Sequence, residues 1–203
     1  MRQVAAVILA AGEAKRFRCP AAGTKLAAEL NGKPLIRHVA EAALASRAHP
    51  VLLVTGHGCG HVLHALDGLL LERVHNCDPG AGLSSSLKLA IAALPKAADG
   101  AIILLGDMPL ISKALIDRLI EAFDKAPAGL LAVVPVHEGR RGNPALIGRG
   151  LFASMMALEG DRGAGCLIGA RAPVVEVPVE DRAIEIDVDT WDDLRLLREL
   201  RAL

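Results

Sequence analysis

The hydrophobic positions of this chain occur in long blocks rather than in residue-by-residue alternation. Four blocks are almost wholly aliphatic, at residues 4–11, 51–55, 100–105 and 130–136, and a glycine directly follows each of the first three. An uninterrupted apolar run of about 4–8 residues that ends at a turn-forming residue predicts a strand buried on both faces of a sheet. We therefore expect these blocks to form the centre of the fold.

Amphipathic segments separate the apolar blocks. Pro34 suits the first turn of a helix over residues 34–46, and Ser84 or Ser85 is expected to cap a helix that ends near Leu94. Further helices are expected at residues 113–125 and 151–156 and after a capping Thr190, with shorter strands at 72–76 and 174–179, the second of them at a sheet edge. Because strands and helices alternate from end to end, we expect one α/β domain over residues 1–203, with a mostly parallel sheet and helices on both faces.

Composition excludes several classes of protein. The chain is 52% hydrophobic but has only three Phe, one Trp and no Tyr, so the core must be aliphatic and the usual stacking platforms for single-stranded nucleic acid are missing. Lys plus Arg and Asp plus Glu both number 23, which argues against nucleic-acid binding by overall charge. The N-terminal apolar run is too short to span a membrane. The four cysteines lie far apart without a CxxC pair, which is typical of a reducing cytoplasm.

Three histidines offer a possible metal site. His57, His61 and His64 would share one face of a helix, as zinc ligands do. We nevertheless favour solvent-exposed side chains at the start of a helix over a zinc site.

The first apolar block leads into the most suggestive loop. Ala10, Ala11 and Gly12 are small enough for close approach to a ligand, and Lys15, Arg16, Arg18 and Lys25 follow them. A loop at the C-terminal end of a buried strand is where open α/β sheets bind ligands, and its amides and basic side chains suit phosphate. An ordinary turn with solvated basic residues explains the pattern about equally well.

Acidic residues follow two later segments. Asp107 comes just after the block at 100–105, where a hard, anionic side chain suits Mg²⁺ bound to nucleotide phosphates, although it could simply form a turn. Asp187 and Asp189 flank Val188, so their carboxylates point to the same side of an extended chain.

Five segments in sequence order together carry a family resemblance. They are LAAG (9–12) with Arg16, Phe17 and Lys25, GLSSSL (82–87), GDMP (106–109), RGNP (141–144) and DVDT (187–190). This set resembles the molybdopterin nucleotidyltransferases (MobA/MocA-like NTP transferases), most closely the branch of molybdenum cofactor cytidylyltransferases. The chain departs from the family pattern by the longer loop at 18–24, by Gly165 where an Arg is usual and by Trp191 where a Pro is usual.

The resemblance implies a Rossmann-like three-layer αβα nucleotidyltransferase fold, with a nucleotide-binding part at about 1–132 and an acceptor-binding part, partly antiparallel, at about 133–203. The resemblance implies that Arg16, Lys25 and Asp107 serve catalysis, and that the nucleotide is bound by Leu9, Ala10, Ala11, Gly12, Lys25, Gly82, Ser84, Ser85 and Asp107. It implies that the acceptor is bound by Arg141, Gly142, Asn143, Pro144 and Asp161. Mg²⁺ would be held by Asp107 and by one member of the pair Asp187 and Asp189, of which we favour Asp189.

The implied reaction is transfer of CMP from CTP to the phosphate of molybdopterin, with release of pyrophosphate. CTP is favoured because guanylyl-transferring relatives typically have LAGG in place of LAAG and a different segment in place of GLSSSL. A guanylyltransferase that uses GTP on the same acceptor remains an alternative, as does a non-catalytic protein that binds molybdopterin and hands it over. A molybdenum hydroxylase is the expected recipient of the product or, for a hand-over protein, of the bound cofactor.

Overall fold

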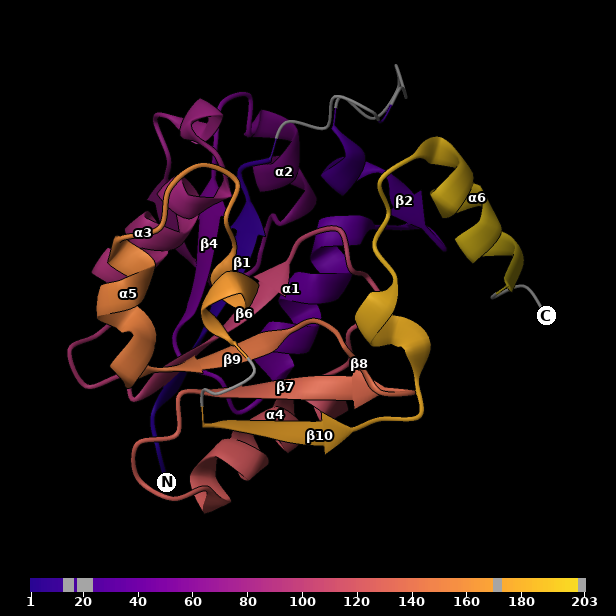
Figure 1. Ribbon diagram of the computed structural model, residues 1–203. Coiled ribbons are helices and arrows are strands. Elements are labelled where there is room, and N and C mark those ends of the chain that lie inside the picture. Colours follow the sequence, from indigo (N-terminus) through magenta and orange to yellow (C-terminus); the bar gives the residue numbers. More distant parts are fainter. Residues whose placement is uncertain (13–16, 18–23, 170–172, 201–203) are drawn as a thin grey trace.

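A computed structural model describes residues 1–12, 17, 24–169 and 173–200 of the chain. Its main sheet has eight strands in the order β10-β7-β9-β6-β1-β4-β5, with β8 paired to β7. The strands are β1 (Val4–Ala10), β4 (Val51–Thr55), β5 (Glu72–His75), β6 (Gly100–Leu105), β7 (Ala132–His137), β8 (Arg140–Arg141), β9 (Ala145–Gly148) and β10 (Val174–Pro178); β2 (Glu29–Leu30) and β3 (Lys33–Pro34) form a separate hairpin. Figure 1 shows how strongly the main sheet twists between β4 and β7.

The sheet is mostly parallel, as predicted. β1 pairs in parallel with β4 and β6, β4 with β5, and β7 with β10, whereas β9 runs antiparallel to both β6 and β7. The antiparallel strands β8 and β9 both follow residue 133, where some antiparallel pairing was expected. The chain passes from β1 outward to β4 and β5 and then returns to β6 on the other side of β1, so the strand order reverses between β1 and β6. Ligands of open α/β sheets bind at such a reversal, beyond the carboxyl ends of the strands.

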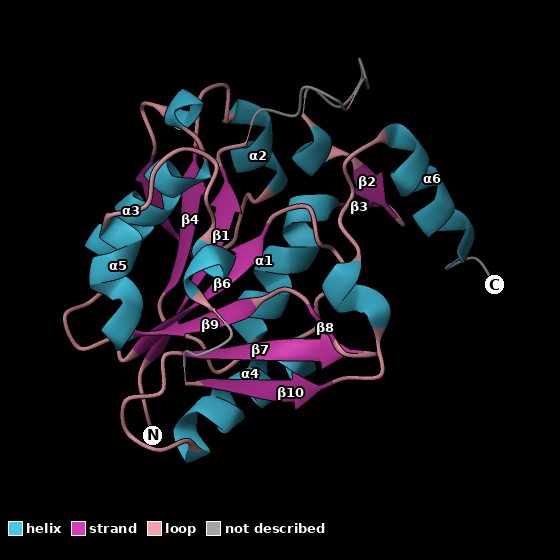
Figure 2. Cartoon of the chain, in the orientation of Figure 1, coloured by secondary structure: helices cyan, strands magenta, loops and turns pink. Residues whose placement is uncertain are grey.

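Helices cover both faces of the sheet (Figure 2). One buried cluster joins Val4, Ala6 and Ile8 to helices on one face, and a second joins Val7 and Leu9 to helices on the other. The first face carries α1 (Leu35–Ala45), α2 (Gly60–Ala65) and α4 (Lys113–Lys125), and the second carries α3 (Leu83–Ala93) and α5 (Phe152–Met156). This confirms the three-layer αβα architecture, and it explains why β1 is apolar at every position. No helix in the described part of the chain is long and apolar enough to cross a membrane.

Single-turn 3-10 helices connect several elements. They are η1 (Lys25–Ala27), η2 (Pro79–Ala81), η3 (Arg149–Leu151), η4 (Ala164–Leu167) and η5 (Arg182–Glu185). Two of them adjoin predicted site residues, because η1 begins at Lys25 and η5 leads into the acidic segment 187–189.

The predicted serine cap of α3 is wrong. The capping position is Gly82, with a φ of 94°, and no side chain caps the helix, which already begins at Leu83. A left-handed φ favours glycine because it has no Cβ. The early start places Ser85 inside the first turn, where its hydroxyl donates to the carbonyl oxygen of Gly82 at 2.8 Å.

The predicted cap of the C-terminal helix α6 (Trp191–Leu200) is confirmed. Thr190 Oγ1 accepts a hydrogen bond from the Asp193 amide at 3.2 Å, and Asp193 Oδ2 accepts from the amides of Thr190 at 2.7 Å and Asp189 at 3.1 Å. This reciprocal arrangement is a capping box with Asp at the third helical position. It fixes the backbone of Asp189 as well as the start of the helix.

We expect Thr190→Ala to lower the free energy of unfolding by about 1 kcal/mol, because one capping partner is lost. The hydrogen bond from Thr190 is the main cause that lowers the pKa of Asp193, against a smaller opposing effect of burial. A lowered carboxyl pKa stabilises the fold above the ordinary aspartate range and loses that contribution as the pH falls through the folded-state value. Urea titrations at pH 7 and pH 3 should therefore show a larger loss at pH 7.

Ser112→Ala is the matched control, since Ser112 Oγ accepts from the Leu115 amide and caps α4. Ser112→Ala should lower the free energy of unfolding by a similar amount without disturbing Asp189. If Thr190→Ala were as stable as the wild type, the capping box would have no energetic role.

Candidate active site

A cleft of about 510 Å³ opens where the strand order reverses. Its walls come from the end of β1, from the glycine-rich turn before α3 and from the end of β6. The lining residues are Leu9, Ala11, Gly12, Pro79, Gly80, Gly82, Leu83, Ser86, Leu105, Asp107 and Asp161. Segments far apart in sequence thus meet at the carboxyl ends of the two central strands.

The glycine-rich turn is closed by a contact from the opposite wall. A Cβ on Gly82 would lie only 2.4 Å from the carbonyl carbon of Gly160, so only glycine fits there. The Ser84 amide donates to the Gly160 carbonyl oxygen at 3.0 Å. This contact draws Asp161, which was predicted to bind the acceptor, to the wall of the cleft.

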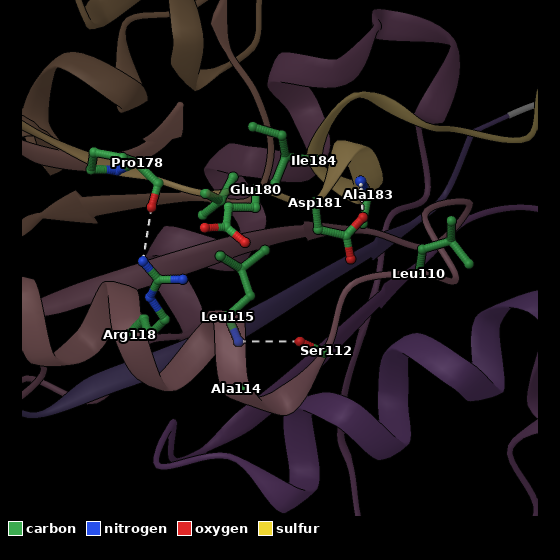
Figure 3. A pocket seen from close by; sticks show the side chains of 11 residues that line it. Leu110, Ser112, Ala114, Leu115, Arg118, Pro178, Glu180, Asp181, Ala183 and Ile184 are labelled. Carbon is green, nitrogen blue, oxygen red and sulfur yellow. Dashed lines mark hydrogen bonds between the residues drawn. The ribbon is translucent and has the colours of Figure 1, made fainter. Parts of the chain in front are cut away.

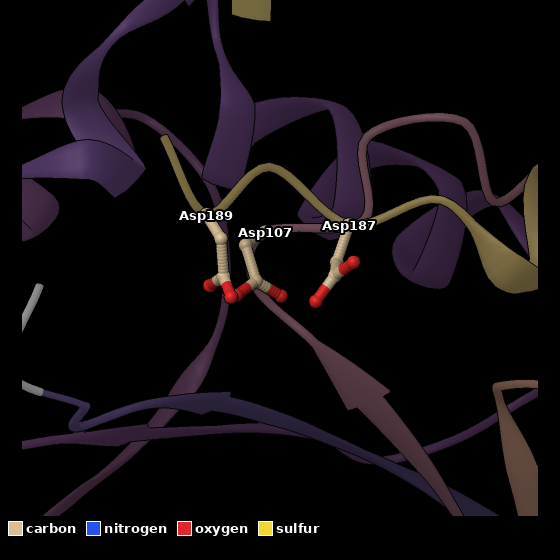
Figure 4. A group of neighbouring side chains, drawn as sticks. All are labelled: Asp107, Asp187 and Asp189. Atoms are coloured by element: carbon tan, nitrogen blue, oxygen red, sulfur yellow. The ribbon is translucent and has the colours of Figure 1, made fainter. Parts of the chain in front are cut away.

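Three carboxylates gather beside the cleft. Asp107 follows β6, whereas Asp187 and Asp189 precede α6, and an oxygen of each lies within 4.8 Å of the others. Figure 4 shows the three side chains projecting to the same side of the two chain segments. The Val188 amide donates to the Asp107 carbonyl oxygen at 3.0 Å, and the Val188 side chain is fully buried, which holds the segments together.

Lys25 bridges two of these acids. Its Nζ lies 2.6 Å from Asp107 Oδ2 and 2.9 Å from Asp189 Oδ1. The next residue, Leu26, is buried in the core and anchors the lysine stem. Burial lowers the pKa of Lys25, but the charges and hydrogen bonds of Asp107 and Asp189 outweigh it, so the pKa is raised above its ordinary value. Lys25 is therefore a fixed cation at neutral pH.

The acid cluster suits a divalent metal ion. Asp107 Oδ1 is buried and has no hydrogen-bond partner among the described residues. Partial desolvation raises the pKa of Asp187, and the charges of Asp189 and Asp107 raise it further, against opposition from its own backbone amide and from Lys25. Crowded carboxylates with an unpaired oxygen are the ligands that hard cations such as Mg²⁺ and Mn²⁺ prefer. Asp107, Asp187 and Asp189 would hold such an ion.

A second, more apolar pocket of about 370 Å³ adjoins the cleft and shares Leu9, Leu83 and Leu105 with it. Of the residues predicted to bind the acceptor, Arg141, Gly142 and Asn143 line this pocket. Arg141 donates through Nε to Glu176 Oε1 at 2.7 Å and through Nη1 to the Ile168 carbonyl oxygen at 3.1 Å, so its guanidinium is held in the wall. Position 165 also lines the pocket, and as glycine it contributes no side chain there.

Several predicted residues lie elsewhere. Ala10 packs in the core on the face opposite Leu9, and Pro144 is buried next to this second pocket without lining it. Arg16 lies outside the described residues. The sequence analysis favoured Asp189 over Asp187 as a metal ligand, although side chains two residues apart in an extended chain point to the same side.

The serines of α3 also need a correction. Ser84 and Ser85 do not line the cleft, and the Ser85 hydroxyl donates to the backbone carbonyl oxygens of Asp78 and Gly82. Ser86 lines it instead, because it lies three residues after Leu83 and so shares its helix face. Asn76 Nδ2 donates to Ser86 Oγ at 3.0 Å, which positions this hydroxyl.

Two other candidate sites are not supported. His57, His61 and His64 are exposed, and within the part of the chain that is described only the three aspartates form a group able to share a metal ion. A cavity of about 480 Å³ lies between the start of α4 and the segment after β10 (Figure 3). Its polar groups make local bonds, with Arg118 donating to the Pro178 carbonyl and Asp181 accepting from the Ala183 amide.

Comparison with known proteins agrees with this geometry. Residues 6–174 match the MobA-like NTP transferase domain. This chain belongs to that family. The match includes the loop after β1, the turn before α3 and Asp107, and it ends before the acidic segment 187–189.

Solved structures of similar proteins cover the whole chain. A homolog of Rv0371c from Mycobacterium sp. strain JC1 is 30% identical over 100% of both chains, with a TM-score of 0.82. Rv0371c of Mycobacterium tuberculosis H37Rv, in complex with manganese, is 30% identical over 97% of this chain and 98% of its own, with a TM-score of 0.78. Among curated proteins, bifunctional protein GlmU of Sorangium cellulosum is 32% identical over 134 residues. These are 64% of this chain but 28% of that protein, so the match covers less than a third of the relative's length.

We expect Asp107→Asn to weaken Mn²⁺ binding by more than about 100-fold, since changes in the outer shell of a metal site already cost 10–100-fold. The substitution is nearly isosteric, so the thermal unfolding temperature should change little. Isothermal titration with Mn²⁺ measures the affinity. Glu180→Gln, an acid outside the cluster, is the control; equal affinity of the two variants would contradict the metal assignment.

Proposed function

We propose that the chain is a divalent-metal-dependent nucleotidyltransferase that transfers CMP from CTP to the phosphate of molybdopterin and releases pyrophosphate. The observation that carries the proposal is the cluster of Lys25 with three aspartates, beside a cleft lined by the loop after β1 and the turn before α3. Membership of the NTP transferase family and the manganese complex of Rv0371c support the metal-dependent nucleotide chemistry.

The proposed roles follow from position and charge. Amides of Ala11 and Gly12 and the basic side chains Arg16 and Lys25 would bind the triphosphate, where positive charge offsets the charge that develops during transfer. A divalent ion held by the aspartates would supply further neutralisation. No general base is needed, because a phosphate nucleophile is already ionised at neutral pH. Catalysis would then consist of positioning and electrostatic stabilisation.

The two adjoining pockets support a two-substrate reaction. The polar cleft ends at the acid cluster and would take the nucleotide, and the pocket with Arg141 and Asn143 would take the acceptor. Leu9, Leu83 and Leu105 belong to both walls, so two bound molecules would meet there. A molybdenum hydroxylase would receive the product.

Pyrophosphate release tests the proposal. The full chain is incubated with Mg²⁺, molybdopterin and each of the four NTPs in turn, with no-acceptor controls. Acceptor-dependent release with CTP is the expected result. Preference for GTP would indicate a guanylyltransferase, and molybdopterin binding without release would indicate a hand-over protein.

Lys25→Met should lower kcat by about 100- to 1,000-fold, the cost of losing one preorganised charge at a transition state. Mn²⁺ affinity should not fall, because the ammonium group that neutralises Asp107 and Asp189 is removed while the ligands remain. Single-turnover rates and metal titration give the two values. Lys33→Met, which breaks only a surface pair with Glu41, is the control. Unchanged turnover would remove Lys25 from catalysis.

Ala11 lines the cleft, and we expect this position to help select the base. Ala11→Gly should weaken discrimination against GTP by about 1–3 kcal/mol, the scale of a change in pocket size. Competition kinetics with paired CTP and GTP measure the ratio of kcat/KM values. An unchanged ratio would show that this loop does not select the base.

A further inference from the structure

A buried hydrogen-bond network lies behind the wall of the cleft that α3 forms. Asn76 directly follows β5 and is only 2% exposed. Asn76 Oδ1 accepts from the Asp78 amide at 2.9 Å, and Asn76 Nδ2 donates to Ser85 Oγ at 2.8 Å and to Ser86 Oγ at 3.0 Å. Because a backbone amide can only donate, the contact with Asp78 fixes which end of the Asn76 side chain faces the two serines.

The two serines use this network differently. Ser85 donates its hydroxyl hydrogen to backbone carbonyl oxygens, those of Asp78 and Gly82. Ser86 lines the cleft, and among the described residues the hydrogen-bond partner of its Oγ is Asn76 Nδ2. A hydroxyl has a single hydrogen, and Asn76 Nδ2, which itself donates, cannot accept it. The Ser86 hydrogen is therefore left for a molecule in the cleft.

A hydroxyl of fixed polarity can distinguish ligands of the same shape. A ligand atom that accepts would satisfy the Ser86 hydrogen, whereas an atom that donates would leave this hydrogen unpaired in a side chain that is only 4% exposed. Cytosine and uracil differ in this way, since ring N3 is an acceptor in cytosine and carries a hydrogen in uracil. A site built to bond one of two such groups rejects the other.

We propose that Asn76 is a positioning residue that keeps the Ser86 hydroxyl a hydrogen-bond donor toward the cleft, and that this donor selects cytosine over uracil at ring N3. Phosphates would lie at the acid cluster near Asp107, which leaves the α3 side of the cleft, with Leu83 and Ser86, for the base. The inference rests on the proposed function in taking a cytidine nucleotide as the ligand, and it requires no transfer to molybdopterin.

Nucleotide selectivity is the first test. The full chain is titrated with CTP and with UTP in the presence of Mg²⁺, and the ratio of the two Kd values is compared among variants. The wild type should bind CTP about ten-fold more tightly, and Ser86→Ala should remove most of this difference, because the donor is lost. Ser85→Ala is the matched control: it removes a hydroxyl bonded to the same Asn76 Nδ2 but outside the cleft, and it should keep the wild-type ratio.

Asn76→Asp separates positioning from support of the fold. The two side chains have nearly the same shape, but a carboxylate only accepts, so Ser86 would donate to it and turn a lone pair to the cleft. The ratio should then favour UTP more than it does in Ser86→Ala, whereas a general loss of structure or added negative charge weakens both nucleotides alike. Should thermal unfolding show that this variant does not fold, Asn76→Ala frees the hydroxyl to rotate and should bring the ratio close to that of Ser86→Ala.

An altered ligand tests the atom that is recognised. In 3-deaza-CTP a C–H group replaces ring N3, and the shape of the base is kept. The wild type should bind 3-deaza-CTP about ten-fold more weakly than CTP, and Ser86→Ala should bind the two equally. Equal affinities in the wild type would overturn the assignment to N3.

The outcomes keep the two proposals apart. A ratio that Ser86→Ala leaves unchanged would overturn the selection of cytosine by this hydroxyl, and a ratio that is unchanged in the Asn76 variants would overturn the positioning role. Ratios that change as expected, in a chain that releases no pyrophosphate with molybdopterin, would uphold the inference and overturn the proposed function. Acceptor-dependent release from CTP, with ratios that no variant alters, would uphold the proposed function and overturn the inference.

Discussion

The ion pairs of Lys25 with Asp107 and Asp189 are the interaction on which the arrangement of the site depends. Three carboxylates within 4.8 Å of one another repel strongly unless a cation lies among them, and Lys25 supplies that charge from 2.6 and 2.9 Å. Removing Lys25 would leave both of its partly buried carboxylate partners uncompensated. The same pairs join the loop after β1, the end of β6 and the segment before α6, which are far apart in sequence.

The hydrophobic core makes this meeting possible. β1 lies between β4 and β6 and is buried on both faces, so the loops that follow β1 and β6 leave the sheet side by side. A separate small cluster, with Phe17, Val188 and Leu194 among its members, attaches α6 and the acidic segment to the rest of the domain. The site therefore combines a rigid half built on the sheet with a second half fixed by a few local contacts.

The polar cleft and the apolar pocket beside it differ in chemistry although they share a wall. Three glycines and two aspartates line the cleft, where charged phosphates would lie, whereas aliphatic side chains make up most of the lining near Arg141. The guanidinium of Arg141 is held by Glu176 and a backbone oxygen, so a bound anion would compete with an existing ion pair. Because an anion must displace this ion pair, a simple phosphate would bind weakly, and only a ligand with further contacts to the pocket would bind tightly.

The sequence by itself determined the architecture, because an unbroken aliphatic run such as Val4–Ala10 is buried on both faces of a sheet and so needs a helical layer on either side. It also determined the Thr190 cap and made Lys25 and Asp107 candidate site residues, since these depend on local sequence pattern. Side-chain direction at α3 was decided by tertiary structure: Gly82 at a φ of 94° starts the helix at Leu83 and turns Ser86, rather than Ser84 or Ser85, to the cleft. The inclusion of Asp187 and the contact of Trp191 with Phe17 were likewise decided there. Such contacts join residues that no local periodicity relates, so only the packed chain shows them.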